Sequence, residues 1–186
     1  MSVAAVVLAA GGGSRFAGAE HKLLTPWRGR PLVSWAVEAA CGAGASEVWV
    51  VAGALDLAVV VPAGVHILHN PQWAQGQATS LGLALDEADR RGMEAVVVGL
   101  GDQPLIPASA WAAVAGATAT PVAVATYDGQ RRNPVRLAAS TWALIDRQGD
   151  AGARTLMRDR PELVSEVACQ GSPADIDTVE DLTRWS

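Results

Sequence analysis

The run Val6-Val-Leu-Ala-Ala-Gly-Gly-Gly-Ser-Arg15 decides how this chain folds. An apolar stretch that is typical of a buried β-strand ends in three consecutive glycines, and Lys22 follows Arg15 before the next helical pattern. Glycines allow backbone N–H groups to approach an anion without interference from a Cβ atom. The two cations add positive charge where a polyphosphate would lie. The segment therefore predicts a first strand followed by a phosphate-binding loop.

Two familiar glycine-rich motifs fail to match this loop. The dinucleotide-binding fingerprint Gly-x-Gly-x-x-Gly, counted from Gly11, would need its third glycine at the position of Phe16. A Walker A loop would end in Gly-Lys-Ser or Gly-Lys-Thr, whereas this loop continues Gly-Gly-Gly-Ser-Arg-Phe. Two interpretations stay open at this point: a phosphate loop of another kind, or a tight turn between a strand and a helix with solvated cations.

Short aliphatic runs alternate with segments of helical periodicity along the rest of the chain. The runs are continuously apolar, which predicts strands covered on both faces of a sheet. Strands are predicted at residues 3–8, 47–51, 65–68, 95–100 and 121–125, and helices at residues 32–43, 79–91 and 108–119. Residues 54–61 fit a short helix or another strand, and Thr178-Val-Glu-Asp181 is typical of the capping box that starts a helix. The β-α-β order predicts a single α/β domain over residues 1–186, with a mostly parallel sheet and right-handed crossovers.

The composition argues against several classes of protein. The chain has 186 residues, of which 50% are hydrophobic, so a sizeable core is expected. Its formal net charge of -5 argues against a nucleic-acid groove or an anionic membrane surface as the main partner, since both require basic surfaces. Cys41 and Cys169 have no metal-ligand spacing, and no apolar stretch is long enough to span a bilayer. We therefore expect a cytoplasmic protein with reduced thiols and with no nucleic-acid or membrane partner.

A second functional motif follows the strand predicted at residues 95–100. The sequence Gly101-Asp-Gln-Pro104 places Asp102 directly after this strand, at the edge of an open α/β sheet where ligands bind. Mg²⁺ is usually held by one or two carboxylates together with substrate phosphates, so Asp102 and the glycine loop would complement each other. Asp175 and Asp177 offer a second carboxylate, and each is explained equally well as a helix cap. The spacing of the pair does not decide which of the two would face a metal.

Five motifs occur in a fixed order along the chain. They are Leu8-Ala-Ala-Gly11 with Arg15 and Lys22, Gly101-Asp-Gln-Pro104, Asn133-Pro-Val135, Gly149-Asp-Ala-Gly-Ala-Arg154 and Asp175-Ile-Asp-Thr-Val-Glu-Asp-Leu182. Together they resemble the molybdenum cofactor nucleotidylyltransferases, most closely the molybdopterin cytidylyltransferase branch, over residues 6–182. The resemblance implies a Rossmann-like three-layer α/β/α nucleotidyltransferase fold and dependence on Mg²⁺. It also implies transfer of a nucleoside monophosphate from an NTP with release of pyrophosphate.

The resemblance further implies roles for individual residues. Those that would bind the nucleotide are Leu8, Ala9, Ala10, Gly11, Gly12, Gly13, Lys22, Gly76 and Ser80, the last two matching the family segment that contacts the base and ribose. Arg15, Lys22 and Asp102 would be catalytic, with both cations on the phosphates, and Asp102 and Asp177 would hold the metal. Arg131, Arg132 and Asn133 would lie near the incoming phosphorylated substrate. The alternatives are a plain loop and helix start around Gly76, and a solvated basic hairpin around Arg131.

The expected partners follow from the same resemblance. Ala9-Ala10-Gly11 resembles the cytidylyl branch, because the guanylyl branch typically reads Ala-Gly-Gly there; CTP is therefore the expected donor and molybdopterin the expected acceptor. A molybdoenzyme or its maturation chaperone would be the protein partner. The chain departs from the family at Gly12, where a larger residue is common, and at Phe16-Ala-Gly18 in place of Met-Gly. The alternatives are a guanylyltransferase, an NTP transferase for another phosphorylated small molecule, and a non-catalytic nucleotide-binding maturation factor.

One tryptophan outside the regular elements adds a candidate contact. Trp73 lies in a predicted loop beside Pro71 and Gly76. An aromatic side chain in such a loop either stacks on a flat ligand ring, here a pterin, or packs against the edge of the sheet. Both interpretations stay open from the sequence.

Overall fold

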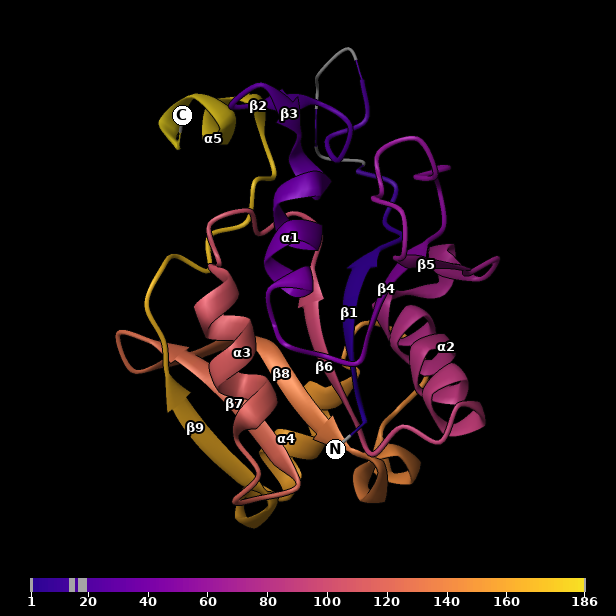
Figure 1. The fold of residues 1–186 in the computed structure, drawn as a ribbon, viewed down its shortest axis with the longest axis vertical. Coiled ribbons are helices and arrows are strands. Elements are labelled where there is room, and N and C mark those ends of the chain that lie inside the picture. Colours follow the sequence, from indigo (N-terminus) through magenta and orange to yellow (C-terminus); the bar gives the residue numbers. More distant parts are fainter. Residues whose placement is uncertain (1, 14–15, 17–19, 186) are drawn as a thin grey trace.

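The computed structural model describes residues 2–13, 16 and 20–185, and a twisted sheet runs through them (Figure 1). Within these residues the sheet has seven strands: β1 (Val3–Ala9), β4 (Glu47–Ala52), β5 (His66–His69), β6 (Ala95–Leu100), β7 (Val122–Tyr127), β8 (Gln130–Ala138) and β9 (Val164–Ala168). Their order is β5-β4-β1-β6-β8-β7-β9. β8 is antiparallel to both of its neighbours, and the other pairs are parallel. The predicted mostly parallel sheet is confirmed.

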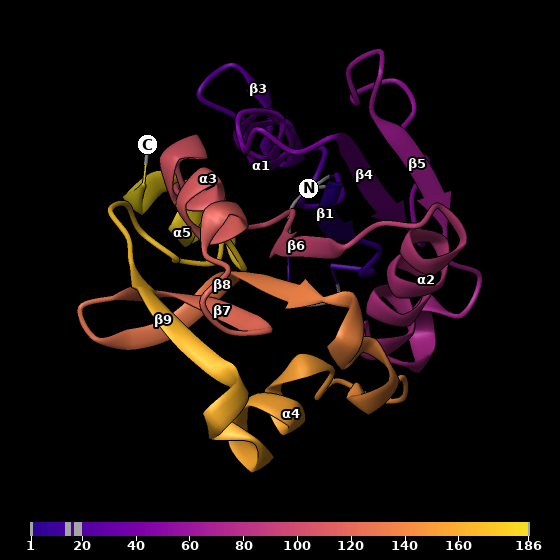
Figure 2. The same cartoon turned by 60° about the horizontal axis from the view of Figure 1, so that its bottom comes forward.

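Helices cover both faces of this sheet (Figure 1; Figure 2). On one face α1 (Leu32–Cys41) and α3 (Ala108–Gly116) share a core cluster with the strands. On the opposite face α2 (Gln77–Arg90) and α4 (Ala153–Asp159) contribute to a second cluster. Successive side chains of a strand point to opposite faces, so Val7 joins the first cluster while Val6 and Leu8 join the second. Because both faces are covered, the central strands are apolar throughout, and the three-layer α/β/α fold is confirmed.

A small third cluster connects elements that lie at the top of Figure 1, beyond the carboxyl ends of β1 and β6. It joins the ribbon formed by β2 (Pro26–Trp27) and β3 (Arg30–Pro31) to the C-terminal helix α5 (Val179–Arg184). Trp27 and Ile176 are buried in this cluster, and Trp185 packs against them. Arg28 Nη2 also donates to the carbonyl oxygen of Trp185 at 2.7 Å. These contacts bring the segment that follows the glycine loop next to the segment that carries Asp175 and Asp177.

Several predicted elements match the structure, and others differ for identifiable reasons. The capping box is confirmed, since the Thr178 side chain and Asp181 each accept a hydrogen bond from the other residue's backbone N–H. Residues 54–61, which by sequence fit either a short helix or a strand, form turns and bends instead. The short elements η1 (Trp73–Gln75), η2 (Ala139–Leu144) and η3 (Pro161–Leu163) are 3₁₀ helices. In the described part of the chain, no helix is both long and apolar enough to cross a membrane.

Strand β8 has no counterpart among the predicted strands. Arg131, Arg132 and Pro134 interrupt its apolar pattern, and proline is disfavoured inside a sheet because it lacks an N–H. The pairing with β7 shifts between Val124 and Ala125, which face Val135 and Arg132 respectively. This β-bulge leaves Asn133 and Pro134 outside the regular pairing, so the proline is tolerated. The bulge also lies beside the functional site described next.

Candidate functional site

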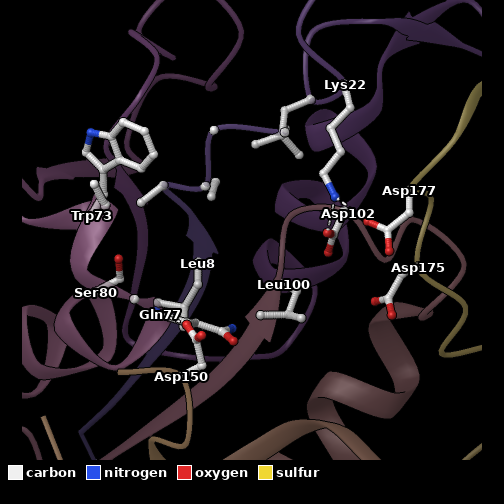
Figure 3. Close-up of a pocket in the computed structure, with 18 of the residues that line it drawn as sticks. Leu8, Lys22, Trp73, Gln77, Ser80, Leu100, Asp102, Asp150, Asp175 and Asp177 are labelled. Carbon is white, nitrogen blue, oxygen red and sulfur yellow. Dashed lines mark hydrogen bonds and ion pairs between the residues drawn. The ribbon is translucent and has the colours of Figure 1, made fainter. Parts of the chain in front are cut away.

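A cavity of about 630 Å³ lies at the carboxyl ends of β1 and β6 (Figure 3). The chain passes from β1 to β4 on one side of β1, and β6 lies on its other side, so the strand order reverses here. Ligands of open α/β sheets bind at such a switch point. Lys22, Asp102 and Asp177 stand at one end of the cavity, and Trp73 and Ser80 stand at the other. The cavity therefore has a charged end and an end with aromatic and hydroxyl groups.

The glycine loop lines the cavity along the stretch that runs from one end to the other. The lining residues from this loop are Leu8, Ala9, Ala10, Gly11, Gly12 and Gly13. Gly101, directly after β6, donates its N–H to the carbonyl oxygen of Leu8 at 3.0 Å, which ties the loop's first residue to the Asp102 segment. Arg15, which the sequence analysis places on the phosphates, lies outside the described residues.

Lys22 bridges two carboxylates at the charged end. Its Nζ donates to Asp102 Oδ2 at 2.7 Å and to Asp177 Oδ1 at 2.8 Å. The Lys22 side chain is 13% exposed, so the ammonium group is largely removed from bulk water. Burial lowers the pKa of Lys22, but the charges and hydrogen bonds of Asp102 and then Asp177 outweigh burial and raise it. Lys22 therefore stays positively charged and holds together two carboxylates that are distant in the sequence.

Ile176 explains how the C-terminal aspartates reach the cavity. Its side chain is fully buried in the third cluster, and its N–H donates to the carbonyl oxygen of Asp102 at 2.9 Å. Asp175 and Asp177 flank this anchored residue, and both line the cavity. Asp177 is the one that contacts Lys22.

Asp175 is held by a separate chain of amide hydrogen bonds. Gln103 Nε2 donates to Asp175 Oδ1 at 2.9 Å, and Asn133 Nδ2 donates to Gln103 Oε1 at 3.0 Å. Gln103 is buried, so both of its amide atoms have partners in the protein interior. Burial, followed by the negative charge of Asp102, raises the pKa of Asp175. Asn133, on the bulge of β8, therefore acts on the charged end through Gln103.

The charged end has the ligand chemistry that a magnesium ion requires. Asp102 Oδ1 is buried and accepts no hydrogen bond from any described residue. A buried carboxylate oxygen without a partner is costly, and a bound cation would satisfy it. No group of three or more His, Cys, Asp or Glu side chains forms a metal site within residues 2–13, 16 and 20–185. The protein would thus supply one or two carboxylates, those of Asp102 and Asp177, and substrate phosphates would supply further oxygens.

Ser80 at the opposite end is oriented by a buried amide. Asn70 Nδ2 donates to Ser80 Oγ and to Thr79 Oγ1, both at 2.9 Å. Because Ser80 Oγ accepts this bond, its own O–H can donate to a ligand in the cavity. Asn70 is therefore a supporting residue that the motif comparison did not single out.

Trp73 lies on the wall of the cavity, close to the glycine loop. A Cβ atom added to Gly12 would lie 3.0 Å from Cζ3 of the Trp73 ring. The missing side chain at position 12 therefore leaves room for the indole ring. Trp73 also packs against Gly53, directly after β4, so both interpretations of Trp73 remain compatible with the structure, and contact to a flat ligand stays a prediction.

A loop from the C-terminal half covers the start of α2. The carbonyl oxygen of Gly149 accepts the N–H of Ala78 at 2.9 Å, and Asp150 Oδ1 accepts the N–H of Gln77 at 3.1 Å. The first N–H groups of a helix have no partner within it, so this loop caps α2 from a distance. Gly76, one of the predicted nucleotide-binding residues, lines the cavity, has a φ of 118° and passes directly against Gly149.

His21 fixes the conformation of the glycine loop. Its Nε2 lies 3.0 Å from the carbonyl oxygen of Gly11, and its Nδ1 accepts the N–H of Leu23 at 3.3 Å. Because Nδ1 accepts, Nε2 must carry the proton and donate to Gly11. Burial lowers the pKa of His21, and the positive charge of Lys22 adds to this, against the opposing effect of the Gly11 carbonyl. The neutral ring is therefore the form that fits this site.

We expect NMR titration of His21 to give the Nε2–H tautomer and a pKa below the ordinary histidine value of about 6.5. A lowered folded-state pKa means that the neutral form stabilises the fold above about pH 6.5, and that this contribution is lost as the pH falls through the folded value. Nitrogen-15 shifts of the ring identify the tautomer and give the pKa. An Nδ1–H tautomer, or a pKa above 6.5, would contradict the hydrogen-bond arrangement.

The three predicted substrate residues are not brought together by the structure. Asn133 lines a smaller cavity next to the first one. Arg131 and Arg132 lie on the exposed hairpin of β7 and β8. There Arg131 Nε donates to Glu166 Oε1 at 2.8 Å, and Arg132 Nη2 donates to Gln130 Oε1 at 2.7 Å. Neither arginine lines either cavity. Arg154 lines both, and its position in Gly149-Asp-Ala-Gly-Ala-Arg154 is the sequence signal that could have singled it out.

Comparison with known proteins agrees with this architecture. Residues 5–166 match the MobA-like NTP transferase domain. The chain is 33% identical over 197 residues to nicotine blue oxidoreductase of Paenarthrobacter nicotinovorans, with 98% of this chain and 95% of that protein aligned. It is 38% identical over 105 residues to the bifunctional protein GlmU of Agrobacterium fabrum, with 55% of this chain but only 23% of that protein aligned.

The solved structures extend the comparison to the whole chain. The crystal structure of Rv0371c from Mycobacterium tuberculosis H37Rv superposes with a TM-score of 0.83 at 26% sequence identity. The superposition covers 99% of this chain and 97% of that one. With a domain match over most of its length and a sheet whose switch point carries the glycine loop and the two aspartates, this chain belongs to the family of MobA-like NTP transferase domains.

Proposed function

We propose that this protein is a Mg²⁺-dependent nucleotidyltransferase that moves CMP from CTP to the phosphate of molybdopterin and releases pyrophosphate. The observation that carries the proposal is the Lys22 bridge to Asp102 and Asp177, which faces the glycine loop across one cavity. Family membership supports an NTP as donor and a phosphorylated small molecule as acceptor. The choice of cytosine and of molybdopterin depends on the motif resemblance, above all on Ala9-Ala10-Gly11.

The proposed step needs little covalent chemistry from the protein. An oxygen of the acceptor phosphate attacks the α-phosphorus of CTP and forms a new P–O–P bond. The bond from the α-phosphorus to the oxygen that bridges to the β-phosphorus breaks, and its electron pair leaves with pyrophosphate. The attacking oxygen is already anionic, so no strong general base is required. Binding, orientation and charge stabilisation are then the protein's main contributions.

The residues of the charged end have distinct parts in this step. The Lys22 ammonium offers a buried positive charge close to the aspartates, where the negative charge of the phosphates would accumulate. When bound by Asp102 and Asp177, Mg²⁺ would supply Lewis-acid charge neutralisation of phosphate oxygens. His21 keeps the glycine loop in position by its bond to Gly11. The proposed assignment of Arg15 to the phosphates remains a prediction.

The assay that tests the function measures pyrophosphate release with Mg²⁺, molybdopterin as acceptor, and each of the four NTPs in turn. We expect release with CTP that depends on both the acceptor and the metal, and its loss when EDTA removes Mg²⁺. Release with GTP alone would replace the cytidylyl assignment by the guanylyl alternative. Absence of release with every NTP, in protein that still binds CTP, would favour another acceptor or a non-catalytic binding protein.

The similarity to nicotine blue oxidoreductase favours a second candidate function, because it extends over 98% of this chain. In that case the chain would transfer electrons to a dye-like organic substrate, and a nicotinamide dinucleotide would be the simplest reductant. The glycine loop lacks the third glycine of the dinucleotide fingerprint, since Phe16 stands there. A separate assay would mix the protein with nicotine blue and NADH or NADPH without any NTP. Enzyme-dependent loss of the blue colour would favour this second function over nucleotidyl transfer.

A further inference from the structure

A second, smaller cavity of about 80 Å³ adjoins the first one. Its wall is mostly apolar and includes Leu81 of α2, Val98 of β6, Leu137 of β8 and Met157 of α4, all of which belong to or pack against the second core cluster. The residues that line both cavities, and therefore form the boundary between them, are Leu8, Gln77, Leu100, Asp150 and Arg154. A ligand that occupies both cavities would place an apolar group in the second one and a polar group at this boundary.

Arg154 is the positively charged residue of the boundary. Its guanidinium group makes no hydrogen bond or ion pair with any described residue, whereas most other described arginines pair with a carboxylate or a carbonyl oxygen. Its neighbour Asp150 accepts the N–H of Gln77 and forms no ion pair with Arg154 among these residues. Five donors in a planar fork suit a phosphate group, which Arg can bind by two parallel hydrogen bonds.

The backbone near Arg154 is held in place by the cap on α2. Gly149 and Asp150 accept the N–H groups of Ala78 and Gln77, and Arg154 N donates to the carbonyl oxygen of Ala151 at 2.9 Å. These bonds connect the segment that carries Arg154 to the same helix start that carries Gly76 and Ser80. These backbone bonds fix the position of Arg154 relative to the first cavity, although its side chain has no partner among the described residues.

We propose that Arg154 binds the phosphate of the acceptor at the boundary of the two cavities, with an apolar or planar part of the acceptor next to that phosphate in the second cavity. The proposal depends on the proposed nucleotidyl transfer for its meaning, but the phosphate site itself does not need turnover. It moves the acceptor's phosphate from Arg131 and Arg132, which are engaged on the exposed hairpin, to a residue that faces both cavities. Asn133, which lines the second cavity, would contact the body of the acceptor.

The kinetic test compares Arg154→Gln and Arg154→Lys with the wild-type protein. At saturating CTP and Mg²⁺, we expect Arg154→Gln to raise the KM for molybdopterin at least tenfold and to leave the KM for CTP within twofold. Arg154→Lys should be intermediate, because lysine keeps the charge but not the two parallel hydrogen bonds. Arg158→Gln is the matched control, since Arg158 lies on the same helix, is 74% exposed and pairs with Asp159. It should leave both KM values unchanged.

A binding test separates this proposal from the proposed function. Phenyl phosphate, which combines a phosphate with an apolar ring, is titrated into each variant by calorimetry, with inorganic phosphate as the comparison. We expect the wild-type protein and Arg158→Gln to bind phenyl phosphate at least tenfold more tightly than inorganic phosphate, and Arg154→Gln to lose this binding. Such a loss supports the site even if no NTP is turned over. Equal binding of phenyl phosphate by Arg154→Gln and wild type, or no preference over inorganic phosphate, would overturn the proposal.

Discussion

The Asp102→Asn variant is expected to lose at least about 10³-fold of the turnover rate while it keeps its fold. The asparagine side chain still offers an oxygen to Lys22, and Lys22 keeps its bond to Asp177 at 2.8 Å. It cannot supply the charged, buried Oδ1 that has no other partner among the described residues. Loss of a charge that stabilises developing phosphate charge removes several kcal/mol of transition-state stabilisation, which corresponds to about this factor. Steady-state pyrophosphate release and circular dichroism measure the two effects.

Asp89→Asn provides the control for this substitution. Asp89 is exposed on α2 and lines neither cavity, so the same chemical change there should leave the rate within twofold of wild type. The thermal midpoint of Asp102→Asn should stay within a few degrees of wild type, because about 1 kcal/mol shifts the Tm of a chain of this size by roughly 2–4 °C. An Asp102→Asn protein that keeps more than a tenth of the wild-type rate with Mg²⁺ would contradict the metal assignment.

The parallel part of the sheet could be predicted because strands that are buried on both faces are continuously apolar in sequence. β1 and β6 contain no polar side chain, and glycines at or just after the end of each strand mark the start of the loop: Gly11 to Gly13 after β1, and Gly99 and Gly101 at β6. β8 and β9 have no such continuous apolar run. β8 contains a bulge and exposed arginines, and β9 is a short edge strand whose residues are only partly buried. Such strands are defined by their neighbours more than by their own pattern.

The candidate site shows the same division. The sequence indicates that the glycine loop, Asp102 and Asp177 belong to one site, and the structure places them on one cavity, because they lie in short motifs at or near the ends of strands. The choice of Asp177 over Asp175 as the partner of Lys22 depends on Ile176, whose burial sets the direction of both neighbours. Ile176 is buried by contacts with residues near the other end of the chain, and a local sequence pattern does not predict such contacts.

Substitution of Gly76 by alanine is expected to destabilise the protein by about 2–3 kcal/mol or more. Gly76 has a φ of 118° and a ψ of 161°, a region that is essentially restricted to glycine and costs other residues about 1–3 kcal/mol. A Cβ atom there would also lie 2.3 Å from the carbonyl oxygen of Gly149 and 2.5 Å from its carbonyl carbon. These are backbone atoms, so no change of rotamer can relieve the overlap. The Tm should fall by roughly 5–10 °C, which differential scanning calorimetry measures.

The overlap in Gly76→Ala also has a functional consequence, because it pushes apart the start of α2 and the loop that contains Gly149 and Asp150. That loop caps Gln77 and Ala78 and leads directly to Arg154. We therefore expect the variant to bind phenyl phosphate more weakly even at temperatures where it is fully folded. Gly116→Ala is the matched control, since no atom lies within 4 Å of the added Cβ and Gly116 has no positive φ. At this position alanine should be neutral or stabilise the fold by about 0.4–1 kcal/mol, because it restricts the unfolded chain. If Gly76→Ala proved as stable as Gly116→Ala, the contact between the loop and the start of α2 would be excluded, and with it the defined position of Arg154.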